Sequence, residues 1–353
     1  MVSFPETGKI HDEFFKELIF PHMGRKRNEV VTGPGFGVDV AIVDLPGEWS
    51  MAMTSDPLSL IPTLGLKESA WLSVQLMAND MSTTGHGPQY AQFTLNLPPT
   101  IKSSDFESYW KYIHKYCDRL GIAITGGHTG RFEGQNSTVS GGGTMIAVAR
   151  QGDFLTSKGA RPGDLIMMTG ESAMMSSSLL AMSFPETIKN RCGSQIYQQA
   201  CELFSKTSVV EVGTSLVQDQ SDTLRISAMH DVTEGGIIGA VYELATASDC
   251  GVEIDVNAIP AGEAQKQVCD CFGLNPNYCI GAGSMIITVH PDDSVKVKNI
   301  LEAKVIDTTV LGEIKEKNHG LKMIDGDQRH PLEHPQTDPY WKAFFNAFKK
   351  GWK

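Results

Sequence analysis

Three aspartates in the first quarter of the chain have the type and placement to bind a divalent cation. Asp39 follows a glycine-rich segment, Asp56 ends an extended segment, and Asp80 lies near the end of a helical pattern. Mg²⁺ prefers oxygen ligands and usually takes one or two carboxylates together with substrate phosphates and water. Each aspartate alone also fits an ordinary role, as a turn residue before proline or as a cap. If the fold brings the three together, they predict a magnesium site.

Three glycine clusters adjoin predicted strands, at residues 33–37, 126–130 and 141–143. Because glycine lacks a Cβ atom, its backbone N–H can approach an anion closely. The first two clusters are therefore candidates for phosphate binding, whereas an ordinary turn is the preferred interpretation of residues 141–143. No cluster is a Walker A loop or a GxGxxG segment that opens a helix, so neither common nucleotide-binding fold is indicated.

A third segment, MHDVTEGG at residues 229–236, follows a predicted strand and opens a predicted helix. Asp231 or Thr233 fits the N-cap position, and Glu234 suits the positive end of the helix dipole. Alternatively, an anion or a metal binds at this helix N-terminus. The residues themselves leave both interpretations open.

The elements that must position these residues form two groups of paired strands with helices between the pairs. The pattern predicts strands at residues 38–45, 49–54, 90–97, 122–125, 144–150, 165–169, 224–229 and 284–289. It predicts helices at residues 11–20, 67–81, 106–120 and 235–247, and a helical region that ends near Val217. Neither half shows a long series of βαβ units, which favours α+β domains with mixed or antiparallel sheets. We place the domain boundary in the turn-rich segment 152–163, giving domains at 1–151 and 152–330.

Residues 331–353 form a separate C-terminal segment that ends in an aromatic helix. Five aromatic side chains line one helical face, with lysines largely opposite: Trp341, Phe344, Phe345, Phe348 and Trp352. Docking of this face on the body of the protein or on a second subunit is the preferred interpretation. Binding to a membrane surface is the alternative.

Composition excludes several classes of protein. The 353 residues carry a formal net charge of −11, which disfavours a nucleic-acid surface. Residues 1–15 show no basic segment followed by an apolar run, and no stretch approaches the roughly 18 apolar residues of a membrane span. Seven scattered cysteines suit a reducing cytoplasm. Among them, Cys269, Cys271 and Cys279 fit the spacing of a zinc site poorly.

Five segments occur in an order that resembles the aminoimidazole ribonucleotide (AIR) synthetase superfamily. They are GPGFGVDVAIVDL, MTSDPL, ANDMSTTGHGPQYAQFTLNLP, GIAITGGHTG and MHDVTEGGIIGAVYELATASDCGVEID. The superfamily includes the hydrogenase maturation protein HypE, selenophosphate synthetase and thiamine-monophosphate kinase. The resemblance spans about residues 5–330 and is closest to the HypE-related branch, because DVTEGG and GLNPNYCIGAGSMIITV resemble motifs of that branch.

This resemblance implies a two-domain, PurM-like α/β (α+β) fold. The N-terminal domain would pair with a second copy in a shared β-barrel, giving a homodimer with ATP near the interface, and the C-terminal domain would be an α/β sandwich. Carried over by motif, the residues that bind Mg²⁺ and phosphates are Asp39, Asp56 and Asp80, with Asn79 beside them. The phosphate path would be lined by Gly126, Gly127 and Thr129, and Asp231 would contribute a catalytic carboxylate.

The chain also departs from the HypE pattern. HypE carries a C-terminal cysteine that is modified, whereas this sequence ends Lys350-Gly351-Trp352-Lys353. Gly130 stands where HypE has a lysine. His128 replaces a carboxylate and is more like selenophosphate synthetase, although that enzyme's reactive N-terminal cysteine is absent here. His128 fits a role in phosphate or substrate binding or in proton transfer, and a structural role equally well.

The expectation is a cytoplasmic Mg²⁺–ATP-dependent enzyme that binds neither nucleic acid nor membrane. It would activate an oxygen or amide by phosphoryl transfer on a small-molecule or protein-borne substrate other than its own tail. Two alternatives stay open: a non-catalytic nucleotide-binding maturation partner, and a thiamine-monophosphate-kinase-like or AIR-synthetase-like enzyme. The sequence indicates neither the acceptor nor whether ADP or AMP is released.

Overall fold

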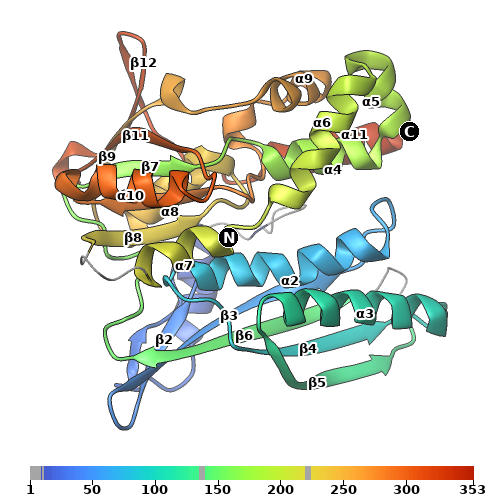
Figure 1. Ribbon diagram of the computed structural model, residues 1–353, viewed down its shortest axis with the longest axis horizontal. Helices are drawn as coiled ribbons and strands as arrows, with labels where there is room; N and C mark the ends of the chain where they lie inside the picture. The colour runs from blue at the N-terminus through green and yellow to red at the C-terminus, as the bar shows by residue number, and fades with distance from the viewer. Residues whose placement is uncertain (1–8, 10–11, 135–139, 219–223) are drawn as a thin grey trace.

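The computed structural model describes residues 9, 12–134, 140–218 and 224–353, which fold into two β-sheets with their helices (Figure 1). The first sheet has the order β1-β2-β3-β6-β4-β5. Its strands are β1 (Val30–Thr32), β2 (Ala41–Leu45), β3 (Trp49–Ser59), β4 (Tyr90–Leu97), β5 (Ala123–Arg131) and β6 (Ser140–Arg150). Strands β4 and β5 pair in parallel, and the other described neighbours pair antiparallel.

Two long helices, α2 (Leu66–Ser82) and α3 (Ser103–Arg119), cover one face of this sheet. Strand β4 alternates as its sequence predicts, with Ala91, Phe93 and Leu95 buried and the residues between them exposed. The buried side chains pack against Met77 of α2 and Tyr109 of α3 in one hydrophobic core. The other face of the sheet carries no described helix.

The second sheet has the order β13-β12-β9-β11-β7-β10-β8. Its strands are β7 (Leu165–Thr169), β8 (Ile226–Asp231), β9 (Gly251–Asp255), β10 (Met285–Val289), β11 (Thr308–Lys315), β12 (Leu321–Asp325) and β13 (Gln328–Pro331). Its helices are α4 (Met174–Ser183), α5 (Pro185–Cys192), α6 (Ser194–Leu203), α7 (Val210–Gln218), α8 (Gly236–Ala247), α9 (Glu263–Phe272), α10 (Ser294–Glu302) and α11 (Pro339–Lys349). Here β9 and β12 pair in parallel, so both sheets are mixed and the predicted two-domain α+β fold is confirmed.

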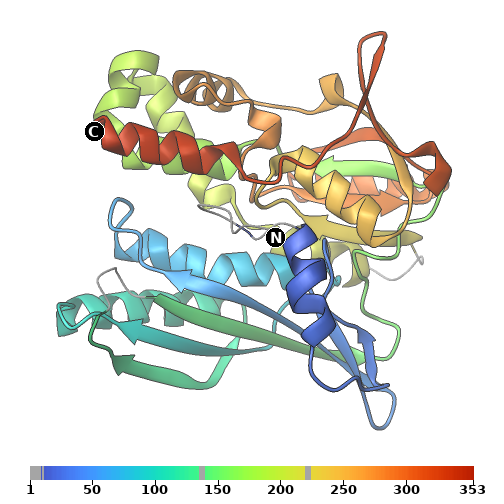
Figure 2. The same ribbon diagram turned by 180° about the vertical axis from the view of Figure 1, so that it is seen from behind.

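The N-terminal helical segment begins at Asp12, with α1 (Asp12–Phe14), a π-helical turn (Phe15–Ile19) and a 3₁₀ turn (Phe20–His22). Figure 2 shows this segment, in dark blue, beside the junction of the two sheets. It confirms most of the predicted helix at residues 11–20, of which His11 lies outside the described residues.

The predicted turn at residues 141–143 is wrong, because all three glycines lie inside β6. A Cβ atom on Gly143 would lie 2.5 Å from Cε of Met77, so glycine lets α2 pack closely on the sheet. Residues 126–130 likewise lie inside β5, and β3 continues past Asp56. The sequence pattern also fails to predict β1, β9, β11, β12 and β13.

Helix α11 docks on the body of the protein, beside α5 and α9 (Figure 2). The ring of Phe184 lies 5.3 Å from that of Phe344 and 6.4 Å from that of Trp352, measured between centroids. The guanidinium of Arg191 stacks 4.1 Å over the Trp352 ring. Docking on the body of the protein is therefore confirmed for Phe344 and Trp352, whereas Phe345 and Phe348 of the predicted aromatic face are exposed. None of the helices in the described ranges combines the length and apolar character needed to cross a bilayer.

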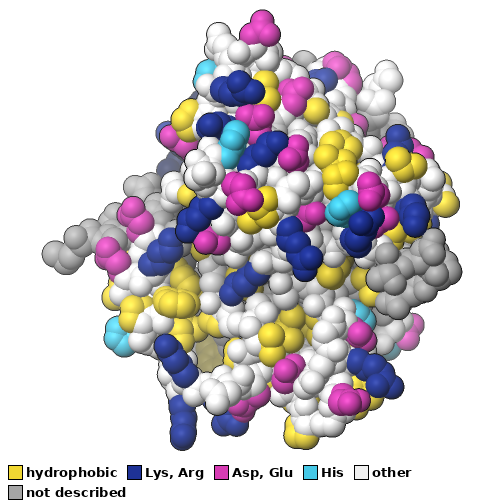
Figure 3. All heavy atoms as spheres, turned by 90° about the vertical axis from the view of Figure 1, so that its left-hand side faces the viewer, with side chains coloured by type: hydrophobic (Ala, Val, Ile, Leu, Met, Phe, Trp, Pro, Cys, Tyr) yellow, Lys and Arg dark blue, Asp and Glu magenta, His cyan; other side chains and the backbone are white. Residues whose placement is uncertain are grey.

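Charged side chains of both signs are interspersed on the face shown in Figure 3. The described residues there form no continuous patch of one sign. The candidate aspartates Asp80 and Asp231 are instead buried between the two sheets.

Candidate functional site

Asp39 and Asp231 meet at the junction of the two sheets, although 192 positions separate them in the sequence. Asp39 lies in the loop before β2, and Asp231 is the last residue of β8. Asp39, His230 and Asp231 each offer one potential ligand atom, and these three atoms lie within 4.8 Å of one another. Gly37 permits this approach: its φ is +70°, and a Cβ atom there would lie 2.5 Å from the carbonyl oxygen of Glu243 in α8.

Asp80 and Asp56 face the same region from the first sheet and its covering helix. The Thr54 hydroxyl donates a hydrogen bond of 2.8 Å to Oδ2 of Asp80, and Asp56 shares a strand face with Thr54 because side chains alternate. Burial and the charges of Asp56, Asp231 and Asp39 hold the pKa of Asp80 well above its usual value. Burial also raises the pKa of Asp56, although Lys9 opposes the shift.

Asp231 has a carboxylate oxygen without a hydrogen-bond partner in the described residues, which suits a cation ligand. Its Oδ2 atom is buried and has no hydrogen-bond partner within the described part of the chain. Burial, followed by the charge of Asp39, raises the pKa of Asp231 to about 7. A buried carboxylate oxygen without a partner is unfavourable, and a divalent cation would supply that partner. This geometry fits a divalent cation such as Mg²⁺ shared by Asp39 and Asp231. Asp56 and Asp80, the other predicted ligands, face the same region but do not join the close group among the described residues.

His230 is a site residue that the sequence analysis missed. Its Nδ1 lies 2.7 Å from Oδ2 of Asp39, and its Nε2 lies 3.0 Å from Oε2 of Glu243. Burial would lower the pKa of His230, but these two carboxylates outweigh it and raise the pKa to about 10. Burial would raise the pKa of Glu243, but Lys9 and His230 hold it below its usual range. The available signal was a histidine directly before Asp231 at a strand end.

Asn79 does not face this cluster. It is fully buried, its Nδ2 donates to the carbonyl of Thr207 at 2.9 Å, and its Oδ1 accepts from the backbone N–H of Val209 at 2.9 Å. Its amide thus joins α2 to the segment before α7. Both ends of this amide are occupied by backbone groups, and a contact between Asn79 and a nucleotide stays a prediction.

The glycine-rich residues of β5 lie apart from the aspartates within one chain. In the sheet register, Asp56 pairs with Gly143, Gly143 with Phe93, and Phe93 with Gly127. Three strand spacings separate Asp56 from Gly127, which is roughly 14 Å. Gly126, Gly127, His128 and Thr129 are exposed and line a pocket of about 390 Å³ that also includes Trp110. The predicted phosphate path does not meet the aspartates in a single chain.

The N-terminus of α8 begins differently from the prediction, which gave its cap to Asp231 or Thr233. The N-cap residue is Gly235, in the left-handed conformation, with no capping side chain of its own. Instead, Oδ2 of Asp338 accepts a 2.7 Å hydrogen bond from the Gly235 N–H. Trp341 Nε1 also donates to Oε1 of Glu234, at 3.1 Å. The C-terminal segment therefore fixes the loop that follows Asp231.

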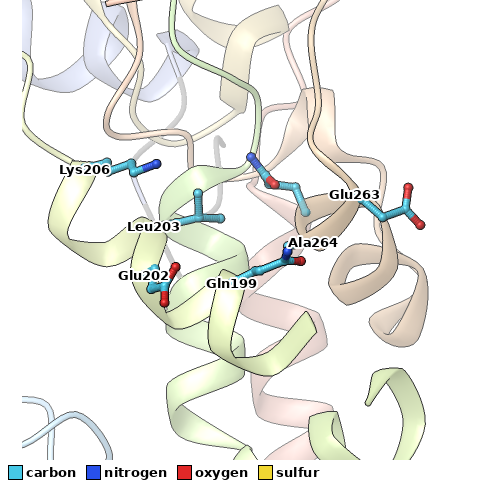
Figure 4. A pocket seen from close by; sticks show the side chains of 7 residues that line it. Gln199, Glu202, Leu203, Lys206, Glu263 and Ala264 are labelled. Atoms are coloured by element: carbon cyan, nitrogen blue, oxygen red, sulfur yellow. The ribbon is translucent and has the colours of Figure 1, made fainter. Parts of the chain in front are cut away.

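A second pocket, of about 250 Å³, lies between α6 with its 3₁₀ extension (Phe204–Lys206) and the start of α9 (Figure 4). Its polar lining includes Glu202, Lys206 and Glu263. Gln265, which also lines it, donates its amide to Oε2 of Glu171, just after β7, at 2.6 Å. Such a lining suits a small polar molecule.

The cysteines supply no comparable site. The described residues contain one group of three or more His, Cys, Asp or Glu side chains suitably close for a metal, and it is Asp39, His230 and Asp231.

Two family models match the chain. Residues 37–149 match the N-terminal domain of AIR synthase related protein, and residues 161–323 match its C-terminal domain. The chain is 25% identical to carbamoyl dehydratase HypE of Escherichia coli, covering 74% of this chain and 75% of that protein. It is 22% identical to a Methanocaldococcus jannaschii protein provisionally named a hydrogenase expression/formation protein, covering 94% and 96%. A solved structure of the hydrogenase maturation protein HypE in complex with ATP superposes with a TM-score of 0.68 at 19% identity, covering 93% of this chain and 95% of that one.

Proposed function

We propose that this chain, which belongs to the AIR synthase related family, is a HypE-like, Mg²⁺–ATP-dependent enzyme. In this proposal it activates an oxygen or amide of an acceptor by phosphoryl transfer. The acceptor is a small molecule or a protein-borne group.

The carboxylate cluster between the two sheets carries the proposal. Asp39 and Asp231 come from different domains, Asp80 and Asp56 lie beside them, and the buried Oδ2 of Asp231 has no partner in the described residues. Four neighbouring carboxylates are mutually repulsive unless protons or a cation neutralise them. In this proposal Asp39 and Asp231 hold Mg²⁺, with Asp80 and Asp56 beside them in the same charged cluster. The bound ion would neutralise the charge on the transferring phosphoryl group.

The nucleotide phosphates are assigned to the ion and to the glycine-rich part of β5. Gly126 and Gly127 have no side chain to block an anion from the backbone, and Thr129 adds a hydroxyl beside them. His128 pairs with Thr94 and so lies on the helix-free face of the sheet. We assign it to phosphate or acceptor binding.

A second copy of the chain is part of the proposal. Strand β5 is an edge strand, and such an edge is a template for further pairing. The helix-free face of the sheet also presents apolar side chains, among them the exposed Trp49 and Tyr90 and the half-buried Met51, Met53 and Val148. A homodimer through this face would cover them. It would also explain how β5, remote from the aspartates of its own chain, takes part in nucleotide binding.

The acceptor in this proposal is not a cysteine of the C-terminal segment. Residues 339–353 contain no cysteine, and Trp352 is packed against Phe184 and Arg191.

Calorimetric titration of Mg²⁺ with a non-hydrolysable ATP analogue tests the proposal. The wild type should bind, and the Asp80→Asn and Asp231→Asn variants should bind at least about tenfold more weakly. Asp118→Asn, an exposed aspartate on α3, is the control and should match the wild type. Equal binding by all four proteins would refute the proposal. Binding without ATP turnover, in the presence of candidate acceptors, would instead favour the non-catalytic maturation partner.

A further inference from the structure

A line of three charged side chains crosses the junction of the two domains, from Asp39 through His230 to Glu243. The two contacts measure 2.7 Å and 3.0 Å. The side chains of His230 and Glu243 are 3% and 2% exposed. Asp39 belongs to the first domain, and the other two residues belong to β8 and α8 of the second. The line therefore joins a predicted metal ligand in one domain to a buried carboxylate in the other.

Both nitrogens of the His230 ring are occupied by carboxylate oxygens. Each ring nitrogen is therefore engaged by a carboxylate, Nδ1 by Asp39 and Nε2 by Glu243. While both contacts hold, neither nitrogen is free to bind a metal. His230 thus lies within ligand distance of Asp39 and Asp231 without being able to ligate a cation there.

The contact with His230 fixes one oxygen of Asp39. Oδ2 accepts from His230 Nδ1, and Ser157 Oγ donates to the same oxygen at 3.3 Å. With Oδ2 committed to these donors, Oδ1 is the oxygen that Asp39 can offer to a cation. The orientation of the carboxylate is then set by His230 and Ser157 rather than by the ion itself.

Glu243 is held in turn by partners on its other side. Its Oε1 lies 3.5 Å from Nζ of Lys9 and 3.3 Å from Nε2 of His334. Gly37 packs against the backbone of the same residue, in the loop that leads to Asp39. Glu243 therefore anchors His230 and borders the loop that carries Asp39, while no hydrogen bond or ion pair described here joins it to Asp80 or Asp231.

We propose that His230 is a positioning residue that presents Asp39 to the cation, and that Glu243 holds His230 in that orientation. The inference rests on the proposed cation site. It assigns a specific task to two residues outside the ligand set: partners of this kind orient metal ligands, and their loss usually weakens metal affinity about 10- to 100-fold.

The test measures Mn²⁺ binding by electron paramagnetic resonance, with no nucleotide present, in the wild type and in His230→Gln, His230→Arg and Glu243→Gln. We expect His230→Gln to weaken Mn²⁺ binding by about tenfold or more. We expect His230→Arg to restore most of it, because a guanidinium can donate to both carboxylates. Glu243→Gln should weaken binding in the same direction by a smaller factor. His114→Gln, an exposed histidine on α3, is the matched control.

Four results would overturn the inference. Unchanged Mn²⁺ affinity in a folded His230→Gln protein would leave His230 as a purely structural contact between domains. Nitrogen coupling to the bound Mn²⁺, measured by spin-echo modulation, would make His230 a ligand. If His230→Gln does not fold, unchanged affinity in Glu243→Gln would decide against the proposal. Failure of the wild type to bind Mn²⁺ would overturn the cation site as well. Wild-type binding therefore tests the site, and the variants test the positioning role of His230.

Discussion

The carboxylates of Asp39 and Asp231 belong to different domains, yet an oxygen of one lies within 4.8 Å of an oxygen of the other. This pair places two acidic groups from different domains side by side. Two like charges at such a distance, away from water, repel each other, and the charge of Asp39 helps to raise the pKa of Asp231. The domain junction should therefore respond to any agent that changes the charge of the cluster.

Neutralising one buried carboxylate should stabilise the metal-free protein and abolish its response to Mg²⁺. Asp80→Asn removes a charge that burial and three neighbouring aspartates make unfavourable. We expect a higher melting temperature without Mg²⁺, and a loss of the extra stability that ligand binding gives the wild type. That extra stability is about 2.7 kcal/mol when the ligand is at 100 times its Kd. Thermal melts with and without Mg²⁺ and nucleotide measure both effects. A lower melting temperature for the metal-free variant would contradict the repulsion argument.

The pKa of Asp231 is about 7. It predicts that the stability of the metal-free protein and its affinity for Mg²⁺ change with pH in opposite directions. Without Mg²⁺, the folded state holds this proton more tightly than the unfolded chain, whose carboxyl titrates near pH 3.9. The stability from this group is full below about pH 4 and is lost as the pH rises through 7. Mg²⁺ binds the deprotonated form, so its apparent affinity should fall as the pH drops below about 7. Melts and Mg²⁺ titrations across this range check both signs, and an Mg²⁺ affinity that stays flat across it would refute the assignment.

Alanine substitutions at Gly126 and Gly127 distinguish a role of β5 in phosphate binding from a role in folding. A Cβ atom added at Gly126 meets nothing within 4 Å, whereas one added at Gly127, where φ is +140°, would lie 1.9 Å from the Phe93 carbonyl oxygen. Gly126→Ala should therefore fold normally and weaken nucleotide binding, since a methyl group would block the backbone. Gly127→Ala should fold poorly. Melting temperature and analogue affinity, measured together, distinguish the two; normal nucleotide binding by Gly126→Ala would remove β5 from the phosphate path.

The helix-free face of the first sheet predicts the oligomeric state. Met53→Lys places a charge among the apolar side chains of this face and should convert a dimer to a monomer, which light scattering after size-exclusion chromatography measures. Val295→Lys, at an exposed valine of α10, should leave the assembly unchanged. A wild type that is monomeric at high concentration would show that this face is not the dimer interface.

Because α11 docks on the body of the protein, replacing Phe184 and Phe348 with alanine should lower the free energy of unfolding by different amounts. Phe184 is 1% exposed and contacts Phe344 and Trp352, whereas Phe348 is 60% exposed. Phe184→Ala should lower the free energy of unfolding by about 3–5 kcal/mol, and Phe348→Ala by less than about 0.5 kcal/mol. Urea unfolding monitored by tryptophan fluorescence gives both values. Similar values for the two variants would mean that the aromatic face does not pack as described.

Local sequence patterns predicted much of the fold because they act over short distances. The alternation in β4 and the helical spacing of α2 and α3 place these elements correctly. The short strand β1 and strands β11 to β13 carry weaker patterns, and their pairing partners set their extent. Gly141 to Gly143 resembled a turn, since glycine composition does not distinguish a turn from a strand packed closely under a helix.

The candidate site was predicted less completely, because convergence of distant residues is not a local property. The family likeness supplied Asp231 as a catalytic residue. The structure places its carboxylate beside Asp39 of the other domain, which the sequence did not predict. His230 and Glu243 gain meaning only when α8 packs beside β8. Asn79 was named for its position next to Asp80, but neighbouring residues on a helix point about 100° apart, so the two side chains face different surroundings.

The hydrogen bond between Asp338 and Gly235 joins residues 103 positions apart. It means that the polypeptide's final segment completes the start of a helix only four residues beyond Asp231. A protease that cuts the connection after β13, or a truncation that removes Asp338, would leave that helix frayed at its first turn. A change at the surface of the protein would then disturb a buried helix. We expect loss of the C-terminal segment to be accompanied by loss of order in α8.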